Sequence, residues 1–250
     1  FAFMVVSAQM SLGGFYAEVT RAVGQMPLGR NGLLAMLIVV AGVLSAVFSN
    51  DVICLAMTPV VARICLERRV DPLPFLVGLA CAANLGSAAT LIGNPQNMLI
   101  GSLLRLPFAG YAWAALVPVA LSLIALWAWL AFGPGARAAA RARNTKDPGP
   151  PLQAGAAIVP TLPTVPGAAD ADAPPFDAWQ TAKGLTVASA LMVVFLFTGW
   201  PREVAALVGA GMLLLSRRLH SAQVMGYVDW PLLLLFIGLF VVNHAFQGTG

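Results

Sequence analysis

Two polar interruptions inside otherwise apolar stretches constrain this chain more than any other feature. The first is Phe48-Ser49-Asn50-Asp51, and the second runs from Asn84 to Asn97. Both stretches are apolar enough to lie in a lipid bilayer. Non-helical backbone at membrane depth is tolerated only where protein or a water-filled cavity satisfies its N–H and C=O groups. Paired interruptions of this kind indicate the binding site of a secondary transporter.

The composition agrees with a membrane location. Hydrophobic residues make up 59% of the chain and charged residues only 10%, whereas soluble domains average about 25% charged residues. The net charge is +4, and the basic residues gather between apolar runs, which indicates membrane orientation rather than nucleic-acid binding. We find no phosphate-binding loop, paired-histidine metal site or nucleophile elbow. The sequence therefore predicts an all-α integral membrane protein and not an enzyme.

The first interruption separates two apolar runs of similar length. Leu33–Phe48 is about 16 residues long and Val52–Leu66 about as long, whereas a membrane span needs about 20. Arginines precede the first run and close the second. Because basic residues concentrate on the cytoplasmic side, both ends are expected there. The pattern favours a re-entrant hairpin over residues 33–66. The alternative is two full spans with the interruption outside the membrane.

The second interruption lies in an apolar run that is too long for one straight span. Leu73–Leu104 covers about 32 residues and has Gly86, Gly93 and Pro95 near its centre. Glycine permits unusual backbone angles, and proline disfavours helix at the preceding residue but suits the first turn of a helix. We predict a broken helix over 73–104, with an unwound stretch at about 86–94 and a second half-helix that starts near Pro95.

Further apolar runs give the remaining crossings. Phe108–Phe132 is predicted to be a span. Residues 144–178 are rich in proline, alanine, glycine and aspartate and are predicted to be a disordered cytoplasmic linker. Leu185–Thr198, Val204–Leu215 and Pro231–Val242 follow as shorter apolar runs. In all, we expect about six spans plus one hairpin.

A weak internal repeat suggests how these elements are organised. Phe3–Gly14 and Phe240–Gly250 both pass from an aromatic-led apolar segment through a polar step to glycine. The basic flanks give the two copies opposite directions, and inverted repeats are typical of secondary transporters. We predict a first repeat at 1–143, which begins with the end of a spanning helix, and the start of a second, inverted repeat at 179–250. The chain is then expected to be a fragment, with a second hairpin and broken helix beyond Gly250.

Asp51 is the sharpest single candidate for chemistry. A carboxylate at membrane depth is costly and usually faces a pathway, a partner or an ion. Ser49 and Asn50 place neutral oxygens beside it, and hydroxyls, amides and freed backbone carbonyls are suitable ligands for sodium. The N-termini of nearby half-helices suit an anion. The simpler alternative places Asp51 at the water-exposed tip of an ordinary loop.

The second interruption supplies a larger set of candidates. Its side-chain candidates are Asn84, Ser87, Thr90, Asn94 and Asn97, and its backbone candidates are Gly86 and Gly93. Helix packing through small residues, which is common in membranes, would explain residues 86–89. It does not explain three amides between 94 and 97 in apolar surroundings. This amide cluster therefore favours a binding site.

Together these motifs resemble the ion transporter superfamily, which includes arsenite permeases, NhaD-type sodium/proton antiporters, citrate carriers and divalent-anion/sodium symporters. The resemblance rests on Ser49-Asn50-Asp51, Met57-Thr58-Pro59 and the 84–97 run. It implies an inverted-repeat fold, a homodimer and elevator-type movement. In sodium-coupled members a Ser-Asn-Thr hairpin tip and the facing loop bind sodium and part of the anion. Asp51 stands where those members have threonine, which favours the arsenite-permease or antiporter branch.

The sequence thus predicts secondary active transport of a small anion, such as arsenite or a carboxylate, coupled to a proton or sodium. We expect residues of both interruptions to contact the substrate or an ion, namely Ser49, Asn50, Asp51, Gly86, Ser87, Thr90, Gly93, Asn94 and Asn97. Ser49, Asn50, Asp51 and Gly86 are the expected sodium ligands among them. A sodium/proton antiporter and, more remotely, a non-transporting membrane scaffold are the alternatives. The resemblance implies a multi-pass protein of the bacterial inner membrane with no cofactor beyond the coupling ion.

Overall fold

The computed structural model describes residues 2–133, 176–198, 202–214, 226 and 230–247, and every regular element in them is an α-helix. Three helices are long and apolar enough to cross a membrane, namely α3 (Arg30–Val47), α7 (Phe108–Phe132) and α10 (Ala178–Phe197). The others are α1 (Ala2–Leu12), α2 (Phe15–Gln25), α4 (Asn50–Glu67), α5 (Leu73–Ser87), α6 (Pro95–Leu103), α11 (Arg202–Leu214) and α13 (Trp230–Gln247). The prediction of an all-α membrane protein is confirmed.

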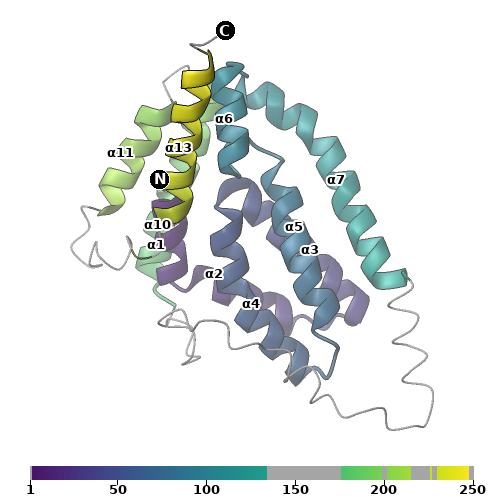
Figure 1. The fold of residues 1–250 in the computed structure, drawn as a ribbon. Coiled ribbons are helices and arrows are strands. Elements are labelled where there is room, and N and C mark those ends of the chain that lie inside the picture. Colours follow the sequence, from purple (N-terminus) through teal and green to yellow (C-terminus); the bar gives the residue numbers. More distant parts are fainter. Residues whose placement is uncertain (1, 134–175, 199–201, 215–225, 227–229, 248–250) are drawn as a thin grey trace.

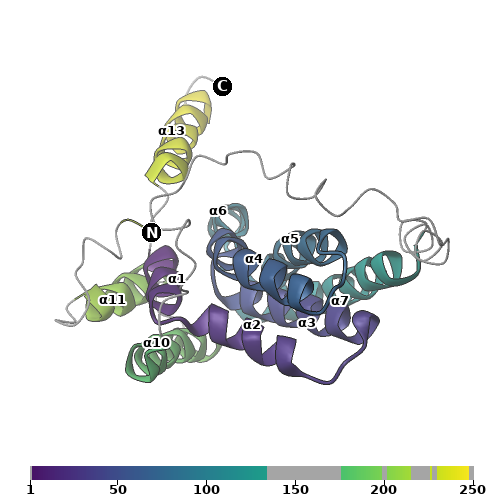
Figure 2. The same ribbon diagram turned by 90° about the horizontal axis from the view of Figure 1, so that it is seen from below.

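Two groups of helices stand side by side, with α13 off to one side of both (Figures 1 and 2). One group consists of α1, α10 and α11, and the other of α2 to α7. Helices α1 and α10 are antiparallel. At one end the rings of Phe3 and Phe195 have centroids 5.9 Å apart, and at the other the Asp177 N–H donates to the Gly13 carbonyl at 3.1 Å.

Helix α10 begins at Ala178, seven residues before the apolar run that starts at Leu185. The Asp177 side chain caps it by accepting from the N–H groups of Trp179 and Gln180. Gln180 in its first turn is buried, and its side chain accepts from the Gln9 amide of α1 at 2.5 Å. Ala178 is thus helical, whereas residues 144–175 of the predicted linker lie outside the described residues.

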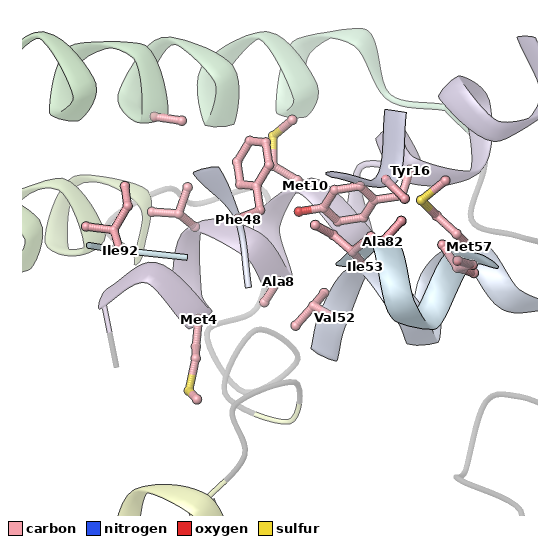
Figure 3. Packing of buried hydrophobic residues seen from close by; sticks show 14 of the residues in the cluster. Met4, Ala8, Met10, Tyr16, Phe48, Val52, Ile53, Met57, Ala82 and Ile92 are labelled. Atoms are coloured by element: carbon pink, nitrogen blue, oxygen red, sulfur yellow. The ribbon is translucent and has the colours of Figure 1, made fainter. Parts of the chain in front are cut away.

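The second group is built around the α3–α4 hairpin, along which α2 lies. At the hairpin tip, Tyr16 packs against Phe48 with ring centroids 5.8 Å apart (Figure 3). At the other end, which we call the base, the Arg68 guanidinium donates to the carbonyls of Gly24, Met26 and Leu28. Helix α2 therefore follows α4 from the tip to the base, and its last carbonyls are satisfied by a cation.

Helices α3 and α5 are in backbone contact. A Cβ atom built on Gly86 would lie 2.2 Å from the carbonyl oxygen of Gly42 and 2.5 Å from its Cα. No side chain fits there, so glycine at position 86 lets the helices meet at a distance typical of small-residue crossings in membranes. This contact brings the hairpin and the end of α5 together a few residues from both interruptions.

Helix α7 extends well past the hairpin tip. Helices α3 and α7 are antiparallel, because the Trp127 indole near the end of α7 donates to the Asn31 carbonyl at the start of α3. Gly42 faces Leu123, with 3.0 Å between a Cβ built there and the leucine Cδ1. Figure 1 shows α6 and α7 rising beyond the hairpin.

Candidate functional site

The hairpin tip is a two-residue connection. Helix α3 ends at Val47, Phe48 and Ser49 follow in extended conformation, and α4 begins at Asn50. Phe48 is buried and anchors the tip among the aromatic rings of α2, whereas Asp51 in the first turn of α4 is exposed. Within this described segment the Ser49 side chain makes no hydrogen bond that caps α4. Asp51 therefore places a carboxylate in the first turn of α4, where the partial positive charge of the helix N-terminus favours a negative group.

The tip touches α5 through a pair of amides. The Asn50 Nδ2 donates to the Asn84 Oδ1 at 3.1 Å, although the residues are 34 positions apart in the chain. This bond uses one N–H of Asn50 and one lone pair of Asn84, so the Asn50 oxygen and the Asn84 amino group can still meet a ligand. The two sequence interruptions thus meet at these two asparagines.

The second interruption is the connection between α5 and α6, residues 88–94. It folds back on the end of α5, because a Cβ on Gly93 would lie 2.2 Å from the carbonyl oxygen of Ser87. The carbonyl of Gly86 accepts from the Ala89 N–H at 3.0 Å. Helix α6 then begins at Pro95, where the Asn94 side chain caps it by accepting from the Asn97 N–H at 2.8 Å.

The amides of this connection mostly satisfy its own backbone. The Asn97 Nδ2 donates to the carbonyls of Ser87 at 3.3 Å and Thr90 at 3.0 Å. The Asn94 Nδ2 donates to the Ser87 hydroxyl at 3.1 Å, and that hydroxyl donates to the Asn84 carbonyl at 2.8 Å. These amide donors satisfy the unwound backbone, as membrane depth requires. What Asn97 can still offer a ligand is its Oδ1 acceptor.

Three hydroxyls bind this region to its neighbours. Ser45 of α3 donates to the Ala83 carbonyl at 2.5 Å, and Thr90 donates to the Ala46 carbonyl at 2.5 Å. Tyr111, in the first turn of α7, donates to the Ala88 carbonyl at 3.0 Å.

Sequence reasoning missed Ser45 and Tyr111. Ser45 lies four residues after Ala41, a small-residue spacing that marks helix packing faces in membranes, and this spacing could have identified it. Tyr111 is the only tyrosine in the 108–132 run. Its hydroxyl was the available signal, since a buried phenol normally finds an acceptor.

Comparison with known proteins places the chain in a family. All of its residues, 1–250, match the family model described as CitMHS, citrate transporter. The chain belongs to the CitMHS family. This membership confirms the predicted resemblance to the ion transporter superfamily.

Individual relatives of this CitMHS-family chain are also transporters by name. The silicon efflux transporter LSI3 of rice is 36% identical over 111 residues, which cover 44% of the chain and 23% of the relative. An uncharacterized transporter of Mycobacterium tuberculosis is 29% identical over 259 residues, which cover 99% of the chain and 54% of the relative. The putative transporter arsB of Dictyostelium discoideum is 38% identical over 63 residues, which cover 25% of the chain and 11% of the relative. The chain spans about half the length, or less, of these relatives.

Within the CitMHS-family fold, the predicted site residues fall into two sets. Ser49, Asn50 and Asp51 form the tip, and Ser87, Thr90, Asn94 and Asn97 form one hydrogen-bonded cluster in the break. Gly86 and Gly93 lie at close backbone contacts. Ligand binding by any of them stays a prediction. Among the described residues no three His, Cys, Asp or Glu side chains cluster in a way that could hold a metal ion.

Proposed function

We propose that this CitMHS-family chain is part of a secondary active transporter, rather than an enzyme, that carries a small anion such as citrate, another carboxylate or arsenite, coupled to a proton or sodium. The observation that carries the proposal is the meeting of the hairpin tip and the helix break at Asn50 and Asn84. Each is an interruption of helix, and both lie in a membrane protein where such interruptions form transport sites.

The α4 N-terminus is the better anion site of the two helix starts. The Ser49 side chain does not cap it, and the N-terminus of a helix attracts anions through its partial positive charge and its backbone N–H groups. At α6, Pro95 has no N–H and Asn94 takes the N–H of Asn97. An anion placed at α4 would also contact the Asn50 amide.

Asp51 supports coupling to a cation. Its carboxylate lies in the first turn of α4, beside the Asn50 amide and the Ser49 hydroxyl, and such oxygens suit sodium. Protonation of Asp51 would equally remove its repulsion of an anion at the same helix start. Both N–H groups of Asn97 and one of Asn94 are already bonded to the protein, so Asn97 offers a ligand its oxygen. This second observation favours sodium/proton antiport as the alternative function.

The same geometry supports a re-entrant hairpin. Helices α6 and α7 extend beyond its tip (Figure 1), so Ser49-Asn50-Asp51 would lie inside the bilayer if α7 crosses it. We further propose a bacterial inner-membrane location and a homodimer, both implied by the superfamily resemblance. Elsewhere in the described chain, α7 exposes apolar residues including Trp113, Val117 and Leu121, which suit contact with lipid or a second copy.

The test is uptake by the full-length protein in liposomes. Radiolabelled citrate and arsenite are offered separately, each with and without a sodium gradient or a pH gradient. We expect gradient-driven uptake of one anion, and its loss in the variants Asp51→Asn and Asn97→Ala. Glu67→Gln is the matched control, because Glu67 is an exposed carboxylate at the base end of the same helix, paired with Arg63 at 3.0 Å.

Each alternative has its own outcome. Transport in both site variants equal to that of the unmodified protein would refute the site. Proton release on sodium addition with no anion requirement would favour the antiporter. A membrane scaffold predicts that cysteines replacing Ser49 and Asn94 resist water-soluble thiol reagents from both sides of the membrane.

A further inference from the structure

We propose that Ser45 and Thr90 are positioning residues whose hydroxyls hold the hairpin tip at a fixed register against the helix break, and thereby determine how tightly the site binds its ligand. The inference rests on the function proposed above. Neither residue needs to touch the ligand, since both act through the backbone that carries Asn50 and Asn84.

The two hydroxyls form a reciprocal pair of bonds. Ser45, fully buried on α3, donates across to the Ala83 carbonyl of α5 at 2.5 Å. Thr90, 7% exposed in the break, donates back to the Ala46 carbonyl of α3 at 2.5 Å. One bond therefore runs from the hairpin to the broken helix, and the other from the broken helix to the hairpin.

Packing and hydrogen bonds both contribute to the register of these two segments. The contact between Gly42 and Gly86 brings the α3 and α5 backbones together, and the side chains of Leu34 and Ile38 pack against Gly78 of α5. Hydrogen bonds are directional, and they weaken steeply as distance or angle departs from the optimum. Ala46 also lies in the last turn of α3, where carbonyls lack intrahelical donors. The Thr90 hydroxyl supplies that missing donor.

Both hydrogen bonds lie close in the sequence to the two asparagines that face each other at the site. The Ala83 carbonyl directly precedes Asn84, and Ser45 lies five residues before Asn50. The Asn50–Asn84 bond is already 3.1 Å long, so a shift of about 1 Å between the segments would break it. Loss of either hydroxyl should thus loosen the tip against the break and weaken ligand binding.

The experiment has a structural arm that needs no transport. Full-length protein lacking its native cysteines receives Asn50→Cys and Asn84→Cys, and the rate of cross-linking by a short bifunctional methanethiosulfonate is measured in liposomes. Thr90→Val and Ser45→Ala remove the hydroxyls, and Thr90→Ser keeps one. Ser122→Ala is the matched control, because it removes a hydroxyl that bonds to a carbonyl of its own helix, Pro118 at 2.8 Å.

A transport arm uses the same variants with Asn50 and Asn84 intact, and citrate as the probe. We expect Thr90→Val and Ser45→Ala to slow cross-linking and to raise the KM about five-fold, the scale of one lost hydrogen bond, with little change in maximal rate. Thr90→Ser and Ser122→Ala should match the unmodified protein in both arms.

The outcomes separate this inference from the proposed function. Unchanged cross-linking in Thr90→Val and Ser45→Ala would overturn the positioning role. Slower cross-linking with an unchanged KM would overturn its link to ligand affinity. If the unmodified protein takes up neither citrate nor arsenite, the proposed function fails, and the cross-linking arm still decides whether the hydroxyls hold the tip.

Discussion

Replacing Gly86 by alanine tests whether the backbone contact between α3 and α5 holds the candidate site together. The added Cβ would lie 2.2 Å from the Gly42 carbonyl oxygen, whereas ordinary van der Waals contact begins at 3.4 Å. The obstructing atoms are backbone, so no side chain can rotate away. The helices must therefore separate by about 1 Å or bend, because protein interiors leave no spare volume at such a contact.

The cost follows from three contributions. Overpacking costs about 1–3 kcal/mol, and alanine offsets about 0.5–1 kcal/mol through its higher helix propensity. Separation also stretches the bonds from Ser45 and Thr90, which contribute about 0.5–1.5 kcal/mol each. We expect a net destabilisation of about 2–4 kcal/mol, which lowers the melting temperature by several degrees, and by fewer in a longer protein because the unfolding entropy grows with length.

The assay is thermal unfolding of the full-length protein in detergent, followed by tryptophan fluorescence. Gly78→Ala is the matched control on the same helix, because its Cβ would meet side chains and not backbone: the terminal methyl groups of Leu34 and Leu130 at 3.2 and 3.3 Å, and Ile38 Cγ1 at 3.6 Å. Those side chains can move by a few tenths of an ångström, so we expect a melting temperature within about 2 °C of the unmodified protein. Equal melting temperatures for Gly86→Ala and Gly78→Ala would refute the reasoning.

Three other changes test contacts that hold the helices in place. Arg68→Ala removes the cation that binds three carbonyls at the end of α2, and it should lower the free energy of unfolding by about 2–3 kcal/mol and speed hydrogen exchange at that end. Arg63→Ala is the control, because it breaks only an exposed ion pair and should cost less than about 0.5 kcal/mol. Tyr111→Phe leaves a carbonyl of the α5–α6 connection without its 3.0 Å donor; hydrogen exchange should accelerate in that connection and not at the base of the hairpin. Gln9→Leu leaves the buried Gln180 amide unpaired and should lower the free energy of unfolding by about 1–3 kcal/mol. In a double-mutant cycle, replacing Gln9 and Gln180 together by leucine should recover much of that loss, whereas strictly additive effects would contradict the pairing.

The helical membrane class could be predicted because it depends on local properties. Low charge and long apolar runs identify membrane helices without any knowledge of contacts. A helix occupies the long apolar run at 108–132, and the chain leaves helical conformation near Phe48 and between Ser87 and Pro95. The superfamily resemblance, drawn from the same two interruptions, is confirmed by the family match. The division into two inverted repeats stays a prediction.

The start of α10 shows where local reasoning fell short. The sequence predicted a return to the membrane from Trp179 but did not show which polar residues of the first turns of α10 would be buried. Gln180 and Thr181 are polar, yet they are buried because Gln9 and the Gly13 carbonyl, more than 160 residues away, satisfy them. Polar residues become acceptable inside a membrane protein only through such partners.

The sequence by itself determined that this chain forms membrane helices and where they are interrupted, because hydropathy and the backbone limits of glycine and proline act over a few residues. Only the tertiary structure decided what the polar residues of the interruptions do. The amides of Asn94 and Asn97 satisfy the break itself, Asn50 reaches Asn84 across 34 positions, and Thr90 reaches Ala46 across 44. Hydrogen-bond partners at such separations are fixed by how helices pack, and they distinguish groups used by the fold from groups that can meet a ligand.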